Sequence, residues 1–313
     1  MGIPSPRGPP GVQRQPYQTP DTALLETILP KTYAHETDIS NVRHPVPLVD
    51  PVNRIILVTN GKCGGTTLKH VFFRNAGLQP FNFRVHELSL DFGPIFTARY
   101  CMRAWKRRHL TELAPHLETR DLTAFYRRRY SAGHFEAAAA AGYAVLMVCR
   151  NPHHRAASAF DDKFCGADVD KSFVQEMVKE AGADGDITFN QFLTYLARTP
   201  DKAHNGHWRR QTYVVDGLTV DHFIRIEHLA QDLEAVNHVF PAASFAEGVH
   251  FQRNIYAQEE SPYPSDVTDI PASEIRRIKS ETGVSPPKNA YLTSRTKETL
   301  RQIYCEDFKR LPY

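Results

Sequence analysis

Three short segments along the chain have the apolar and β-branched content of buried strands: residues 55–58, 143–149 and 222–226. Segments with the apolar spacing of helices follow them, most clearly at 188–198 and 296–309. Strands that alternate with helices predict an α/β fold, with a parallel β-sheet flanked by helices.

The rest of the chain gives weaker signals. Residues 1–20 are rich in Pro, Gly, Gln and Arg, which predicts a disordered N-terminal arm before a single domain at 21–313. Residues 44–47 are expected to be an extended lead-in to the first strand, and 78–85 a further strand. Additional helices are expected at 229–239 and near 273–280.

A glycine-rich loop follows the first strand. It contains Lys62, then Gly64 and Gly65, and it closes on Thr66 and Thr67 where a helical pattern begins. A strand, a glycine-rich loop and a helix N-terminus together form an arrangement that binds phosphate through backbone N–H groups. This loop is not a Walker A motif, because its lysine precedes the last glycine.

A second motif follows the strand at 143–149. Arg150 stands at the end of this strand, and Pro152 suits the first turn of a helix. Arg155 and Ser158 are three residues apart and therefore share a helix face. Ligands of parallel α/β sheets bind beyond the carboxyl ends of the strands, where both Lys62 and Arg150 are expected.

These two motifs, Lys-x-Gly-Gly-Thr-Thr and Arg-Asn-Pro-x-x-Arg-x-x-Ser, resemble the 5′-phosphosulfate and 3′-phosphate motifs of sulfotransferases. Three weaker segments resemble carbohydrate and heparan-type O-sulfotransferases and their bacterial relatives: 133–135, 207–227 and 304–313. The resemblance covers most of residues 54–313 and implies the sulfotransferase fold. One departure is Gly61, where the family often has proline, and it is expected to leave the loop backbone less restrained.

The resemblance implies that the cofactor is 3′-phosphoadenosine 5′-phosphosulfate (PAPS), whose product is 3′-phosphoadenosine 5′-phosphate (PAP). It assigns the 5′ side of PAPS to Gly61, Lys62, Cys63, Gly64, Gly65, Thr66 and Thr67, and the 3′-phosphate to Arg150 and Ser158. Lys62 would neutralise the leaving phosphate, so that no metal is required. A guanidinium with a hydroxyl suits a phosphate dianion. Cys63 is interpreted as a spacer and Arg155 as a structural residue.

The acceptor hydroxyl requires a general base. The resemblance favours His134, because it lies just before the second strand, where the family's base histidine lies. His207 is the second candidate, and Glu136 and Glu227 stay open. His153 and His154, in the first turn after Pro152, are expected to be solvated.

Charge suggests the kind of acceptor. Residues 100–129 carry eight basic and three acidic side chains, a balance of +5, whereas the whole chain carries +3. This segment is either a solvated helix face or an electrostatic funnel for a polar or anionic glycan-like acceptor. No nucleic acid partner is expected.

Location follows from what the sequence lacks. No apolar run reaches transmembrane length, and the N-terminus has no signal-peptide core. The five cysteines are scattered and odd in number, which fits a reducing compartment. We therefore expect a cytoplasmic, bacterial enzyme without a transmembrane segment.

Two other functions stay open at this point. A P-loop kinase or phosphotransferase would need a Walker A lysine and a carboxylate for magnesium at a strand end, and neither is evident. A nucleotide-binding protein that has lost catalysis is the other alternative, against which Lys62 and His134 argue.

Overall fold

The computed structural model describes residues 47–50, 53–75, 137–241 and 261–313. All of them lie in one compact unit that spans residues 38–313. Several predictions concern residues outside these ranges: the arm at 1–20, the strand at 78–85, the basic segment at 100–129, and the candidate bases His134 and Glu136.

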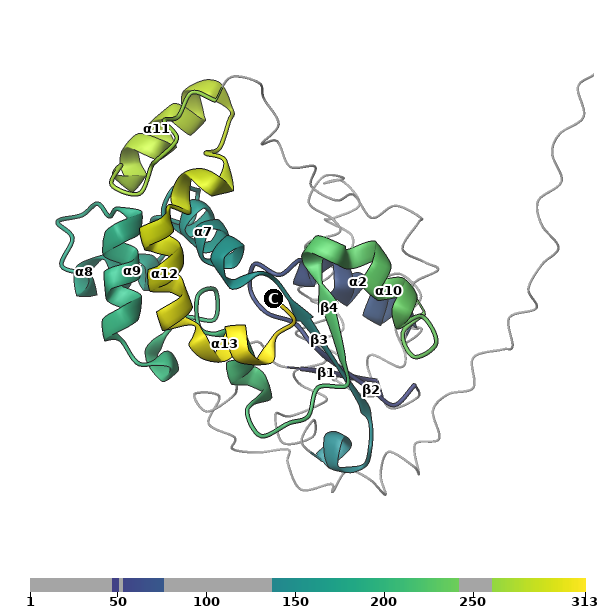
Figure 1. Cartoon of the computed structure of the whole chain (residues 1–313). Helices are drawn as coiled ribbons and strands as arrows, with labels where there is room; N and C mark the ends of the chain where they lie inside the picture. Colours follow the sequence, from purple (N-terminus) through teal and green to yellow (C-terminus); the bar gives the residue numbers. More distant parts are fainter. Residues whose placement is uncertain (1–46, 51–52, 76–136, 242–260) are drawn as a thin grey trace, which may run out of the picture. The chain divides into compact units, whose positions relative to one another are not determined.

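A four-stranded sheet lies at the centre of the described structure (Figure 1). Its order is β1 (Leu48–Asp50), β2 (Ile55–Val58), β3 (Ala144–Cys149) and β4 (His222–Arg225). Strands β2, β3 and β4 run parallel, as predicted, whereas β1 pairs antiparallel with β2. The prediction missed β1, because three residues give too little alternation to indicate a strand; the extended lead-in predicted at 44–47 lies just before it.

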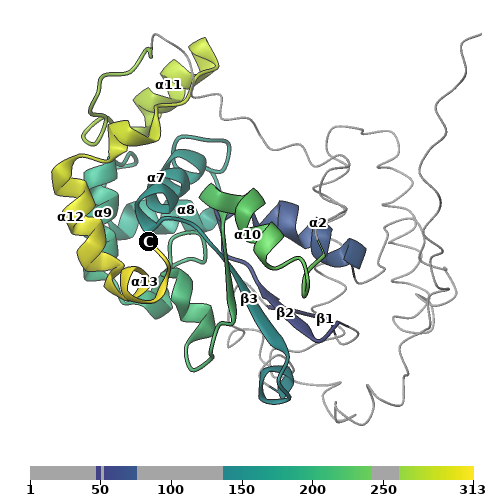
Figure 2. The ribbon, with the colours of Figure 1, turned by 45° about the vertical axis from the view of Figure 1, so that its right-hand side comes forward.

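Both faces of the sheet are buried at β2 and β3, which explains the continuous apolar runs of these two strands. On one face α2 (Gly65–Asn75) and α10 (Leu229–Ala235) cover the sheet, and the two helices lie close together in Figure 2. On the other face, η3 (Gln211–Val215) and Leu311 pack against Val58 and Met147.

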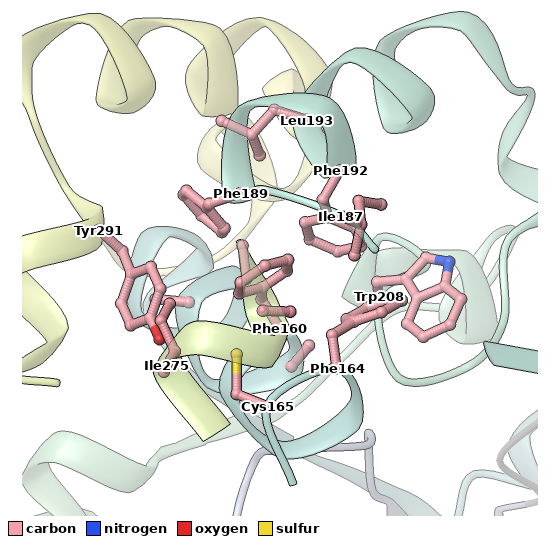
Figure 3. Packing of buried hydrophobic residues seen from close by; sticks show 14 of the residues in the cluster. Phe160, Phe164, Cys165, Ile187, Phe189, Phe192, Leu193, Trp208, Ile275 and Tyr291 are labelled. Atoms are coloured by element: carbon pink, nitrogen blue, oxygen red, sulfur yellow. The ribbon is translucent and has the colours of Figure 1, made fainter. Parts of the chain in front are cut away.

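A separate helical layer continues from β3. It consists of α7 (Pro152–Lys163), α8 (Ser172–Glu180), α9 (Phe189–Arg198), α11 (Ala272–Thr282) and α12 (Ser294–Ile303). Phe160 lies at its centre, with ring centroids 5.3 Å from both Phe164 and Phe189 (Figure 3). Pro152 lies in the first turn of α7, as predicted, and Asn151 caps this helix. Thr188 and Gln191 form a capping box at the start of α9.

Two predicted helices differ from the structure. The helix expected at 229–239 ends at Ala235. The helix expected at 296–309 is divided at Tyr304 into α12 and α13 (Cys305–Arg310). Tyr304 has φ −105° and ψ 33°, outside the helical region, and its hydroxyl donates to the Trp208 carbonyl oxygen over 2.5 Å. This tertiary hydrogen bond fixes the break, which local apolar spacing does not reveal.

Candidate functional site

The glycine-rich loop connects β2 to α2 at the carboxyl edge of the sheet. Lys62 and Gly64 both have positive φ, 66° and 68°. A Cβ atom on Gly64 would lie 2.4 Å from Cδ1 of Ile226, so the position requires glycine. The left-handed conformation of Lys62 costs about 1–2 kcal/mol, a local strain of the kind found at functional sites. Helix α2 has no acidic residue in its first turn, which leaves its N-terminus suited to an anion.

Arg155 holds this loop from the first helix of the second motif. Its side chain is only 2% exposed. Nε donates to the Gly61 carbonyl oxygen (2.9 Å), Nη1 to Arg209 (2.7 Å) and Nη2 to Gly206 (3.1 Å). A Cβ on Gly61 would lie 3.0 Å from the Gly206 oxygen and 3.1 Å from Cα of His207. Gly61 is therefore restrained by packing and by Arg155, contrary to the expectation of a looser backbone.

We expect Arg155→Met to lower the free energy of unfolding by about 3 kcal/mol or more, because three buried carbonyl groups lose a charged donor. Urea unfolding followed by circular dichroism measures this change. Arg198→Met is the matched control, since Arg198 is exposed and donates one 3.4 Å bond to the Glu180 carbonyl oxygen. Equal effects of the two substitutions would contradict the structural role of Arg155.

Gln211 joins the two phosphate motifs. Its Oε1 accepts from the Arg150 backbone N–H (2.9 Å) and from the Cys63 thiol (3.1 Å), and its Nε2 donates to the Arg150 carbonyl oxygen (2.8 Å). Nη1 of Arg150 donates to the Lys62 carbonyl oxygen over 3.0 Å. Motifs almost ninety residues apart thus form one hydrogen-bonded unit. Gln211 had appeared in sequence only as part of a weak resemblance.

Helix α13, near the C-terminus, binds the segment that begins at Gln211. The carboxylate of Asp307 accepts from the Gln211 backbone N–H (2.8 Å) and from both N–H and hydroxyl of Thr212 (2.9 and 2.8 Å). Tyr304 binds the Trp208 carbonyl oxygen, as described above. Two of the weak resemblances, at 207–227 and 304–313, therefore contact each other and support the phosphate loop.

One face of α7 lies along the loop. Arg155 contacts Gly61, and two turns later Oδ2 of Asp162 lies 3.2 Å from Nζ of Lys62. Ser158 lies between them on this face, by helical periodicity. In the described part of the chain its hydroxyl forms no hydrogen bond with a side chain or backbone group. Asp162 was missed from the sequence, although its spacing from Arg155 and Ser158 indicates the shared face.

The ionisable groups of the loop are strongly affected by burial. Burial lowers the pKa of Lys62, and Asp162 opposes that shift. Burial raises the pKa of Cys63 to about 11, so the thiol stays protonated at neutral pH. This agrees with the interpretation of Cys63 as a spacer, since the thiolate is the nucleophilic form.

His207 lies against the loop at Gly61, and a hydrogen bond fixes the tautomer of its ring. Oδ1 of Asn205 accepts from the His207 backbone N–H (3.1 Å) and lies 2.6 Å from Nδ1 of the ring. Because an oxygen cannot donate there, Nδ1 carries the proton and Nε2 is the acceptor. The ring stacks on Phe173, with centroids 5.8 Å apart. Burial and the nearby Lys163 and Lys62 lower its pKa to about 4.

The structure places the other candidate bases less favourably or not at all. Glu227 accepts from the Asn151 backbone N–H (3.0 Å) and from the Tyr313 hydroxyl (2.7 Å). Burial alone would raise the pKa of Glu227, but hydrogen bonds from His154, Tyr313 and the backbone hold it below its usual range. These bonds link β4 to α7 and favour a structural role.

The expectation of solvated histidines in the first turn of α7 is wrong for one of them. His153 is buried, with Nε2 3.1 Å from the Lys297 carbonyl oxygen and its ring against Phe308. The side chain of His154 is 41% exposed, with Nδ1 3.8 Å from Glu227. His153 is held by the packing of α7 against α12 and α13, which the local sequence does not show.

The fold and the loop define a class: an α/β protein with a glycine-rich loop after its first parallel strand and an arginine motif after the second. The sequence model of the sulfotransferase family matches residues 47–313. The chain therefore belongs to the sulfotransferase family, has an α/β sulfotransferase fold, and is a transferase of sulfuryl groups. Comparisons with curated proteins and with solved structures found no match.

The described residues contain neither a candidate membrane span nor a candidate metal site. No helix among them combines the length and apolar character that crossing a membrane requires. No group of three or more His, Cys, Asp or Glu side chains in these ranges is arranged to hold a metal ion. Whether catalysis requires a metal stays a prediction.

Proposed function

We propose that the protein is an O-sulfotransferase that uses PAPS and transfers its sulfuryl group to a hydroxyl of a carbohydrate-type acceptor. The observation that carries this proposal is the direct link between the two phosphate motifs. Arg150 binds the Lys62 carbonyl oxygen, and Gln211 binds both Arg150 and Cys63. A nucleotide with phosphates at both its 3′ and 5′ ends requires two such motifs at one edge of the sheet.

Three features of the chain fit this nucleotide. Nε of Arg150 is buried and forms no hydrogen bond among the described residues, and its partner in an ion pair is Oε1 of Glu227, 3.9 Å away. The Ser158 hydroxyl is also unpaired in that part of the chain, and the N-terminus of α2 begins at Gly65. Donors that form no hydrogen bond within the described residues suit phosphate oxygens. Contacts of the Thr66 and Thr67 hydroxyls with the 5′-phosphate stay a prediction, because the described residues do not include their side chains.

In this proposal the bound PAPS supplies an activated sulfuryl group on a phosphate oxygen. The amides at Gly64 and Gly65 hold the 5′-phosphate, and Arg150 and Ser158 hold the 3′-phosphate. The ammonium of Lys62 neutralises the charge that develops on the leaving phosphate, and a base takes the proton of the acceptor hydroxyl. Positioning and electrostatic stabilisation by the protein are the main sources of such rate enhancement.

The base is proposed to be His134, with His207 as the alternative. His134→Ala should lower transfer by about 10²–10⁴-fold while PAP affinity stays within a few-fold of wild type. The pH profile of kcat/KM separates the two histidines. Burial holds the pKa of His207 to about 4, so a fall in rate near pH 4 indicates His207. A fall well above pH 4 excludes His207 and is consistent with His134.

Matching alanine variants complete this test. If His134 is the base, His134→Ala loses the acidic limb of the profile and His207→Ala keeps it. The opposite pattern assigns the base to His207. An acidic limb present in both variants would exclude both histidines and direct attention to Glu136.

The acceptor is proposed to be a polar or anionic glycan, because residues 100–129 carry a charge balance of +5 and lead in sequence to His134. A cytoplasmic location is proposed from the free cysteines Cys63, Cys149, Cys165 and Cys305. Both proposals rest on sequence and composition.

Calorimetry with PAP, ADP and ATP tests the cofactor. We expect PAP to bind more tightly than either of the others, because only PAP carries a 3′-phosphate for Arg150 and Ser158. Tighter binding of ATP would favour a phosphotransferase. Binding of PAP without any turnover would indicate a nucleotide-binding protein that has lost catalysis.

A further inference from the structure

The ammonium group of Lys62 already has an anionic partner in the free protein. Its Nζ lies 3.2 Å from Oδ2 of Asp162, and the two side chains are 22% and 42% exposed. Asp162 comes from the α7 face that also carries Arg155 and Ser158. A phosphosulfate that binds at this loop would therefore have to replace the Asp162 carboxylate as the partner of Lys62.

Asp162 can release Lys62 without being left unpaired. The same Oδ2 atom lies 2.7 Å from Nζ of Lys163, whose side chain is 10% exposed. Lys163 in turn contacts Asp168, which also pairs with Lys171. The contact of Asp162 with Lys62 is thus the longest one in a chain of alternating charges, and it is the one that faces the loop.

The other charged or titratable groups that face Lys62 do not replace this carboxylate. They are Lys163 from α7, Lys288 from η6 (Lys288–Tyr291), His207 from the segment before η3, and the Arg150 guanidinium on the Lys62 carbonyl oxygen. All are cationic or neutral. Burial, Lys163 and Lys288 lower the pKa of Lys62, and Asp162 is the group that opposes them.

We propose that Asp162 is a positioning residue that stands in for the anionic cosubstrate: it keeps Lys62 charged and oriented in the free protein, and it is displaced from Lys62 when the 5′-phosphate group binds. This inference rests on the proposed function, because it requires Lys62 to meet a phosphate. It has two consequences. Asp162 competes with the ligand at neutral pH, and it extends ligand binding to higher pH.

The direction in which the loss of Asp162 changes the affinity for PAP follows from the charges. Without the Asp162 carboxylate, a bound phosphate no longer competes for Lys62, so PAP binds more tightly at pH 7. In the free variant, however, Lys62 loses its proton at a lower pH, because burial, Lys163 and Lys288 are no longer opposed. The affinity for PAP then begins to fall at a lower pH than in the wild type.

Calorimetric titration with PAP between pH 6 and pH 10 tests this proposal on the whole protein. We expect Asp162→Asn to bind PAP about two- to five-fold more tightly at pH 7, and to lose affinity at a lower pH than the wild type does. Asp168→Asn is the matched control, because it removes a carboxylate from the same chain of charges without touching Lys62. It should keep the wild-type pH profile.

A double-mutant cycle isolates the contact with Lys62. Asp162→Asn should have no effect on the pH profile of PAP binding in a Lys62→Met background, since no ammonium is left to titrate. An unchanged profile in Asp162→Asn, or the same change in Asp168→Asn, would overturn the proposal. Failure of the wild-type protein to bind PAP at any pH would instead overturn the proposed function itself.

Discussion

Lys62→Ala is expected to lower the turnover of sulfuryl transfer by about 10²–10³-fold, the effect of removing one group that stabilises transition-state charge. The affinity for PAP should fall much less. The reason is that Lys62 acts mainly on charge that develops on the leaving phosphate. Its pairing with the bound 5′-phosphate contributes only a few-fold to PAP affinity, and the loop amides, Arg150 and Ser158 provide the rest. Steady-state kinetics with PAPS, together with calorimetry with PAP, measures the two effects separately.

Lys171→Ala is the control for this experiment. Lys171 is 53% exposed and pairs with Asp168, so it belongs to the same chain of charges but lies away from the loop. Its substitution should leave turnover within about two-fold of wild type, as for most surface positions. Near-normal turnover in Lys62→Ala would remove Lys62 from the mechanism, whatever the affinity for PAP.

Alanine substitutions of Arg150 and Ser158 are expected to remove the preference for PAP over AMP. Hydrogen bonds to a charged group contribute about 1.5–3 kcal/mol, so each variant should lose about 10- to 100-fold in PAP affinity. Binding of AMP, which lacks the 3′-phosphate, should change little in Ser158→Ala. The measurement is the ratio of the two dissociation constants by calorimetry.

Ser158→Ala is the cleaner of these variants. The Arg150 side chain also donates to the Lys62 carbonyl oxygen, so its loss disturbs the loop as well as the phosphate site. The Ser158 hydroxyl has no such second role in the described residues, and Ser172→Ala, at the exposed start of α8, is a matched control. Retention of the preference for PAP in both variants would mean that the 3′-phosphate is held elsewhere.

The parts of the fold that depend on local sequence were predictable. Strands β2 and β3 appear as apolar runs because both faces of the sheet are covered at these two strands. Helices α7 and α9 begin where Pro152 and Thr188 indicate. The break at Tyr304 was not predictable, because a hydrogen bond to Trp208, distant in sequence, fixes it.

The site was predictable as a set of motifs but not as a set of contacts. Lys62 and Arg150 were expected at one edge of the sheet, and the structure joins them through the Lys62 carbonyl oxygen. The role of Gln211 depends on groups about sixty and one hundred and fifty residues away, which no local pattern encodes. The role of Asp162 depends on which face of α7 meets the loop, and only the contacts of Arg155 establish that face.

The most direct test of the proposed function is transfer of labelled sulfate from PAPS to a panel of glycans, with lipids and small alcohols for comparison. We expect the label to appear on a glycan hydroxyl, to require PAPS, and to fall by about 10²–10³-fold in Lys62→Ala. Failure of every acceptor in the panel to take label from PAPS, together with phosphoryl transfer from ATP by the same preparation, would contradict the proposed function.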